Sequence, residues 1–301
     1  MFRGDQKRRI ALATVAAAAM FGGFSTAANA AVVGPINTGS YGGPVEIQYN
    51  GFTTENQSAN YANAGNEHTW GAGFMTSMYE FGNSGNLFYS NATGNPIGYV
   101  VYGIADGSII SDGMGGFNIY NVGCTGGDCD GSIHIDFYEL PGGSSTNFGT
   151  TLGIDNRTGF GDFTGITDIG TPLMAWEFVP GIQTVDDPST PGFDERDAVL
   201  VQNASAVTLP ATGDGDGYAE CVTGPACDLF QAGNFPANPL ADFFIQFSLS
   251  TSVTTEQQAN GWEGRISDPV EATVVPEPAA LAMSGFGLLA LGFAARRRKT
   301  R

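Results

Sequence analysis

Few residues of this chain could carry acid–base chemistry. Its two histidines are His68 and His134. Ser132, His134 and Asp136 alternate with apolar residues, so a β-strand would place all three side chains on one face. A hydrolytic relay needs its base within hydrogen-bond reach of an exposed nucleophile, and neighbours on one strand face rarely meet that condition. We therefore do not expect these residues to act as a relay.

Paired carboxylates are a second source of catalysis, because glycosidases use two of them. Asp136 and Glu139 are close in sequence, but this does not fix the distance between their carboxyl groups. The sequence contains no G-x-S-x-G elbow, no H-E-x-x-H pair and no phosphate-binding loop. We expect no enzymatic activity and assign no catalytic residue; a secreted hydrolase is the alternative.

A candidate metal site lies in the run Asp214-Gly215-Asp216-Gly217. Aligned with the EF-hand pattern, this run puts Thr212 and Thr223 at the two end positions, where carboxylate ligands are missing. Two interpretations stay open. Asp214 and Asp216 form an irregular calcium site, or they belong to a polar turn that uses Asp and Gly for backbone reasons. Calcium is the one cofactor that the sequence suggests.

Aromatic residues offer a binding surface as an alternative to catalysis. Trp70, Trp176 and Trp262, with many Tyr and Phe, could stack on sugars from one face of a sheet. Aromatic residues at alternating positions are also ordinary β-core. We expect the tryptophans in the core, and a carbohydrate-binding module is a rival function.

The elements that must position these residues are β-strands. Between residues 31 and 275 the chain is rich in Gly, Asn, Thr, Ser and aromatics, which disfavours helix and suits short strands joined by turns. Alternating or continuous apolar patterns predict strands at Val45–Tyr49, Ile97–Ile104, Phe117–Val122, Ser132–Glu139, Leu173–Val179, Ala198–Val207 and Phe243–Leu249. No repeat of fixed period is present.

We predict an all-β ectodomain, an antiparallel, jelly-roll-like β-sandwich over residues 31–267. Asp186–Asp197, which contains two prolines, is expected to be a long surface loop. Residues 268–275 are expected to be a linker that presents the residues after it.

The N-terminus has the three parts of a secretory signal peptide. A basic start is followed by an apolar, alanine-rich run from Ile10 to Phe24 and by the small-residue site Ala28-Asn29-Ala30. We expect residues 1–30 to be removed by cleavage between Ala30 and Ala31. Such a segment implies export through the Sec translocon.

The C-terminus has three parts as well. Pro276, Glu277 and Pro278 precede an uncharged apolar run from residue 279 to 295. As a helix with ~1.5 Å rise per residue, this run would span ~26 Å, close to the shortest bilayer crossing. The basic cluster at the very end fixes its orientation, since such residues stay in the cytoplasm. The cluster consists of Arg296, Arg297, Arg298 and Lys299.

This order of Pro-Glu-Pro motif, apolar helix and arginine-rich end resembles the PEP-CTERM sorting tail of Gram-negative bacteria. The resemblance covers residues 276–301 and implies that an exosortase in the inner membrane recognises the tail and cuts near the motif. The chain would then be held by the inner membrane transiently, through residues 279–295, before release to the cell surface or beyond it. An ordinary, permanent membrane anchor is the alternative.

Four cysteines form two local pairs, Cys124 with Cys129 and Cys221 with Cys227. Export leads to an oxidising compartment, where disulfides are the default. Four cysteines allow three connectivities, and the spacing favours the two local bridges. A zinc site is the alternative, but the spacings do not match zinc knuckles.

The exported region is strongly acidic. Residues 31–275 contain 28 Asp and Glu against three arginines, a net charge of −25. This charge repels nucleic acid, so we expect no nucleic-acid partner. It also makes calcium a plausible counter-ion, although general solubility explains it equally well. We predict a non-catalytic structural or adhesive protein of the extracellular matrix or biofilm, with exopolysaccharide as a candidate partner.

Overall fold

The structure, a computed structural model, is almost entirely β-sheet in the part that it describes. That part comprises residues 31–55, 69–126, 129–144, 165–181, 198–207, 209–230 and 241–275. The elements are β1 (Ala31–Val33), β2 (Ile36–Gly39), β3 (Gly43–Glu55), β4 (Thr69–Glu80), β5 (Asn83–Ser90), β6 (Ile97–Ser111), β7 (Phe117–Gly123), β8 (Thr125–Gly126), β9 (Cys129–Asp130), β10 (His134–Glu139), β11 (Thr171–Val179), β12 (Val199–Ala204), β13 (Gly213–Thr223), the 3-10 turn η2 (Cys227–Leu229), β14 (Phe243–Ser250), the helix α2 (Thr255–Ala259) and β15 (Gly264–Val274).

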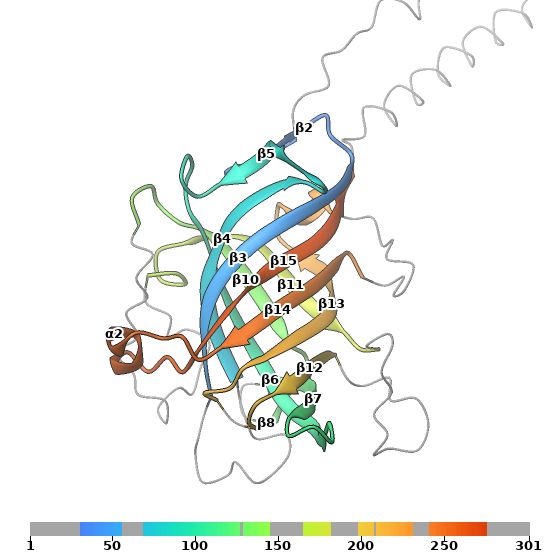
Figure 1. Ribbon diagram of the computed structural model, residues 1–301. Helices are drawn as coiled ribbons and strands as arrows, with labels where there is room; N and C mark the ends of the chain where they lie inside the picture. Colours follow the sequence, from blue (N-terminus) through green and yellow to red (C-terminus); the bar gives the residue numbers. More distant parts are fainter. Residues whose placement is uncertain are drawn as a thin grey trace, which may run out of the picture.

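The large sheet closes on itself into a cylinder (Figure 1). From β6 the hydrogen-bonded order runs through β4, β3, β15 and β14 to β13. Two pairs of strands complete the ring between β13 and β6: β11 with β10 at one end, and β12 with β7 at the other. Among the described residues, eight strands therefore surround the interior at either end. Such a ring is just wide enough for packed side chains or one small ligand.

The all-β, antiparallel prediction is confirmed, but the structure has one closed sheet in place of the expected two-sheet, jelly-roll-like sandwich. The reason lies in the length and curvature of the strands. β3, β4 and β6 have 13, 12 and 15 residues, more than most strands. Bulges interrupt the registers of β4 and β6, and bulges bend strands and increase their twist. Alternation in the sequence predicts strands, whereas their pairing depends on this long-range curvature.

Aromatic packing closes the end of the interior near β11. The Trp176 and Phe243 rings stack with centroids 3.8 Å apart, and Phe137 lies 4.4 Å from Trp176. Phe230, which follows η2, packs on Phe243 at 5.1 Å. All four are buried, and together they form what we call the aromatic end.

Strand β13 has a sequence that reads as a turn, Gly213-Asp214-Gly215-Asp216-Gly217. Its glycines face the interior, where phenylalanine rings occupy the space that a larger side chain would need. A Cβ on Gly215 would lie 2.1 Å from the Phe247 ring, and one on Gly217 would lie 2.8 Å from the Phe178 ring. The alternating pattern is therefore that of a strand whose small residues point inward.

The expected linker at residues 268–275 is wrong. Residues 264–274 form β15, which pairs along its whole length with β3. The Val275 amide donates to the Leu229 carbonyl at 2.9 Å, so the fold continues to that residue. Pro269 does not prevent this, because proline is tolerated where a strand can do without one ladder donor. The folded domain therefore extends beyond residue 267, at least to Val275.

Several predicted segments lie outside the described residues: the signal peptide 1–30, His68, the loop 186–197 and the tail 276–301. Within the described ranges, no helix is both long and apolar enough to cross a bilayer.

Candidate functional site

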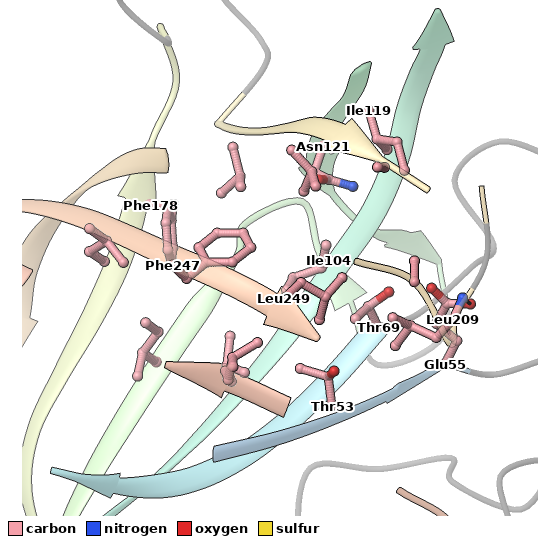
Figure 2. A pocket seen from close by; sticks show the side chains of 18 of the residues that line it. Thr53, Glu55, Thr69, Ile104, Ile119, Asn121, Phe178, Leu209, Phe247 and Leu249 are labelled. Carbon is pink, nitrogen blue, oxygen red and sulfur yellow. Dashed lines mark hydrogen bonds between the residues drawn. The ribbon is translucent and has the colours of Figure 1, made fainter. Parts of the chain in front are cut away.

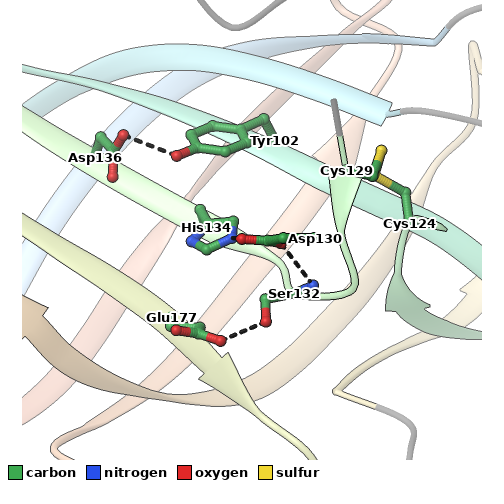
Figure 3. Close-up of polar contacts among 8 residues, drawn as sticks. All are labelled: Tyr102, Cys124, Cys129, Asp130, Ser132, His134, Asp136 and Glu177. Atoms are coloured by element: carbon green, nitrogen blue, oxygen red, sulfur yellow. Dashed lines mark hydrogen bonds and ion pairs between the residues drawn. A yellow bond between two sulfur atoms is a disulfide. The ribbon is translucent and has the colours of Figure 1, made fainter. Parts of the chain in front are cut away.

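The serine, histidine and aspartate that were rejected as a relay lie on β10 and just before it, at the outer surface (Figure 3). Ser132, His134 and Asp136 share a face, as expected, while Ile133 and Ile135 are buried on the other. His134 Nε2 contacts the Asp130 carboxylate at 3.0 Å. That partner was not anticipated, because Asp130 belongs to the short strand β9 and is brought back by the turn before β10.

These contacts do not form a relay. The Ser132 hydroxyl donates to Glu177 of β11, and the Tyr102 hydroxyl donates to Asp136 at 3.0 Å. The hydrogen bond from His134 lowers the pKa of Asp130, while burial raises the pKa of Asp136. Each member thus has a separate partner, and the nucleophile candidate is held by an acid rather than by the histidine.

The glycosidase pair is also separated. Asp136 and Glu139 are three residues apart in β10, whose register with β6 is uninterrupted, so they lie on opposite faces. Glu139 accepts a hydrogen bond from Asn95 at 2.7 Å. The two carboxylates do not face a common substrate space.

The calcium candidates lie within β13 rather than in a loop. Asp214 is exposed and accepts a hydrogen bond from Ser248 at 3.1 Å. Asp216 is half-buried, and burial raises its pKa. In the described part of the chain, no group of three or more His, Cys, Asp or Glu residues could hold a metal ion. The polar-turn interpretation is wrong, since both residues belong to the strand β13.

Both predicted disulfides are present. Cys124 is joined to Cys129 and Cys221 to Cys227. The first closes the turn around the short β8–β9 hairpin. The second ties the end of β13 to η2, which packs over the aromatic end.

The tryptophans are core residues, as expected. Trp70, Trp176 and Trp262 are 3%, 1% and 1% exposed, so they offer no platform for sugars. Trp176 faces the interior, whereas Trp70 and Trp262 belong to a separate cluster that also contains Leu140 and Ile166.

Sequence reasoning missed a cavity of ≈130 Å³ inside the cylinder (Figure 2). Its wall is largely apolar, from Ile104, Phe178, Phe247 and Leu249 among others. Leu209 and neighbouring residues between β12 and β13 line one end. The strands of the ring therefore enclose a space that their side chains do not fill.

That end of the cavity is polar, and we call it the polar end. Glu55 is 7% exposed, and its Oε2 accepts a hydrogen bond from the Leu209 amide at 2.9 Å. Asp106 accepts one from Asn121 at 2.7 Å. Burial raises the pKa of Glu55 to about 8, and the nearby charges of Asp106 and Glu263 act in the same direction. Glu55 is therefore mostly a neutral acid at pH 7.

Three further polar groups line the cavity and have no hydrogen-bond partner among the described residues: Thr53 Oγ1, Tyr99 Oη and Trp176 Nε1. A signal for two of the cavity's polar residues existed in the sequence. The alternation that begins at Val45 and Ile47, continued along β3, places Thr53 and Glu55 on the same inward face.

Comparison with known families gives one result. Residues 274–299 match the PEP-CTERM protein-sorting motif. The comparisons with curated proteins and with solved structures find no match. The chain is thus an exported protein, sorted to the cell surface by an exosortase. More particularly, it is a PEP-CTERM domain-containing exosortase substrate, as the tail predicted.

Proposed function

We propose that the mature chain is a non-catalytic structural or adhesive protein of the extracellular matrix. The observation that carries the proposal is the arrangement around His134, where the groups that could form a hydrolytic relay are each bonded elsewhere. Ser132 donates to Glu177, and His134 contacts Asp130. The Asp130 side chain is 65% exposed, so this ion pair contributes little to stability and organises no buried acid–base site.

The shape of the domain supports release as a rigid unit. The closing of the sheet pairs the eight strands of the ring with one another and so removes most of the edges that could aggregate, although β5 of the same sheet is paired with β4 alone. β15 leads to Val275 with no intervening linker. A cut near Pro276–Pro278 would therefore free the complete folded domain.

Exopolysaccharide is the proposed partner in the matrix. The acidic surface repels anionic polymers, so a neutral polymer, or an anionic one bridged by divalent cations, fits the charge best. The burial of all three tryptophans disfavours a sugar-stacking module.

Complementation of a strain that lacks the chain tests the proposal. We expect loss of matrix cohesion, restored by the wild type and by Ser132→Ala, but not by Glu277→Ala, which blocks processing. Glu256→Ala, at an exposed position of α2, is the matched control for Glu277→Ala. Intact mass of the secreted protein should show a start at Ala31 and no residues 279–301. If Ser132→Ala or His134→Ala were secreted normally but failed to restore cohesion, the non-catalytic assignment would be wrong.

A further inference from the structure

The interior cavity combines an apolar wall with polar groups that the protein itself does not satisfy. Tyr99 and Trp176 are 2% and 1% exposed, and Thr53 is 5% exposed. An unsatisfied buried polar group destabilises a fold, so three of them around one cavity need an explanation. They come from β6, β11 and β3, strands far apart in sequence that converge on the same space.

The chemistry of the three groups restricts what would satisfy them. The Trp176 indole can only donate a hydrogen bond, so its partner must be an acceptor. The hydroxyls of Tyr99 and Thr53 can donate or accept. An oxygen atom of a hydroxyl or carbonyl group can serve all three types of contact, whereas a purely apolar molecule serves none.

Size and charge restrict the ligand further. An engineered cavity of about 150 Å³ in another protein binds benzene, so ≈130 Å³ suits a molecule of similar size. The polar end holds Glu55 and Asp106, which disfavour an anion. Asp106 is already bonded to Asn121, and the raised pKa of Glu55 keeps that acid mostly neutral at pH 7. A cation would therefore find no preformed counter-charge at Glu55.

We propose that the cavity is a binding site for a small, uncharged, mostly apolar molecule of about the size of phenol, with one hydroxyl or carbonyl oxygen. Trp176 donates to that oxygen, and the hydroxyls of Tyr99 and Thr53 complete its hydrogen bonding. This site goes beyond the proposed matrix role and does not depend on it, because it rests only on the residues that line the cavity.

Calorimetric titration of the secreted, processed protein tests the site. The probes are phenol and toluene, which match in size and differ by a hydroxyl in place of a methyl group. We expect the wild type to bind both. The double variant Tyr99→Phe/Thr53→Val removes two hydroxyls and almost no volume, so it should weaken phenol binding about tenfold and leave toluene binding undiminished.

A matched control removes the same two types of hydroxyl elsewhere. Tyr79 donates to Glu46 and Thr76 to the Gln48 carbonyl, and neither lines the cavity. Tyr79→Phe/Thr76→Val should therefore bind both probes as the wild type does. Val201→Phe, which fills the cavity from β12, should abolish binding of both probes while circular dichroism shows an intact sheet.

Two results would overturn the proposal. If the wild type bound neither probe at millimolar concentrations, the three polar groups would hold water only. If the Tyr99/Thr53 variant and its control bound phenol equally well, the oxygen would be held somewhere else.

Discussion

The two ends of the cylinder's interior differ in how they are closed. At the aromatic end, Trp176 and Phe243 stack at 3.8 Å and the η2 segment packs over them, tied to β13 by a disulfide. At the polar end, Glu55 holds the Leu209 amide and Asp106 holds Asn121. Apolar packing closes the first end, and hydrogen bonds to carboxyl groups close the second.

The two ends therefore contribute differently to the stability of the fold. Burying large rings is favourable in itself, since it removes apolar area from water. Burying carboxyl groups is costly, and an acid remains in such a place mainly as a neutral or fully bonded group. We infer that the aromatic end anchors the fold, while the buried carboxyl groups of the polar end reduce its stability.

Trp176→Ala should have the largest effect on the fold. It removes the ring that packs on both Phe137 and Phe243, so we expect a loss of ~3–5 kcal/mol in the free energy of unfolding, measured by urea denaturation. Met114→Ala, at a site 85% exposed, is the control and should change stability by less than ~0.5 kcal/mol. A loss below ~1 kcal/mol at Trp176 would contradict the anchoring role of the aromatic end.

Glu55→Gln tests the polar end through pH. The folded pKa of about 8 is raised above the reference value of 4.5, so the folded state holds this proton more tightly than the unfolded state. The stabilising contribution is complete below pH 4.5 and is lost as the pH rises toward 8. Relative to Glu55→Gln, the wild type should lose ~3 kcal/mol between pH 4.5 and 7.

The pH test needs the other acids held constant. Asp106 and Glu263 face Glu55 and are unchanged in the variant. Asp130, whose pKa is lowered, gives an opposite trend in both proteins, so the difference between their profiles isolates Glu55. Glu256→Gln on exposed α2 is the control. Parallel profiles for wild type and Glu55→Gln would mean that Glu55 ionises normally in the folded protein.

The sequence predicted the aromatic end better than the polar end. The apolar face of β14, with Phe243 and Ile245, followed from alternation, and so did burial of Trp176. The polar end was missed because its residues read locally as exposed acids and amides. Only the pairing of β3 with β4, of β4 with β6 and of β6 with β7 brings Glu55, Asp106 and Asn121 together. Chemistry of that kind depends on sheet closure, which is a long-range property.

Strand β13 also shows that local sequence alone is an insufficient guide, here to an element rather than to a site. Its Gly and Asp residues favour a turn by local propensity. Packing overrides that preference, since Phe247 and Phe178 need the space above Gly215 and Gly217. Contacts across the interior therefore determine the conformation of this segment. Local propensity alone predicted a turn, which was wrong.

The disulfides should have smaller effects than the two interior ends. Each closes a short loop, with Cys separations of 5 and 6 residues, so each constrains the unfolded chain by on the order of 2 kcal/mol. Replacing either pair with alanine should lower stability by about that amount and leave the far-ultraviolet circular dichroism unchanged. Peptide mapping that joined Cys124 to Cys221 or Cys227 would refute the pairing.

Calcium is expected to have the smallest effect on thermal stability. It tests the outer face of the sheet rather than the interior. Asp214 and Asp216 point away from the cavity, and in the described ranges no third ligand joins them. In ~0.15 M salt, where exposed charges more than ~8 Å apart are screened, calcium and magnesium should shift the melting temperature equally. The variant Asp214→Asn/Asp216→Asn should respond like the wild type. A rise with calcium alone that this variant lost would place a cation site on β13, and the acidic outer surface would then have a specific function beyond solubility.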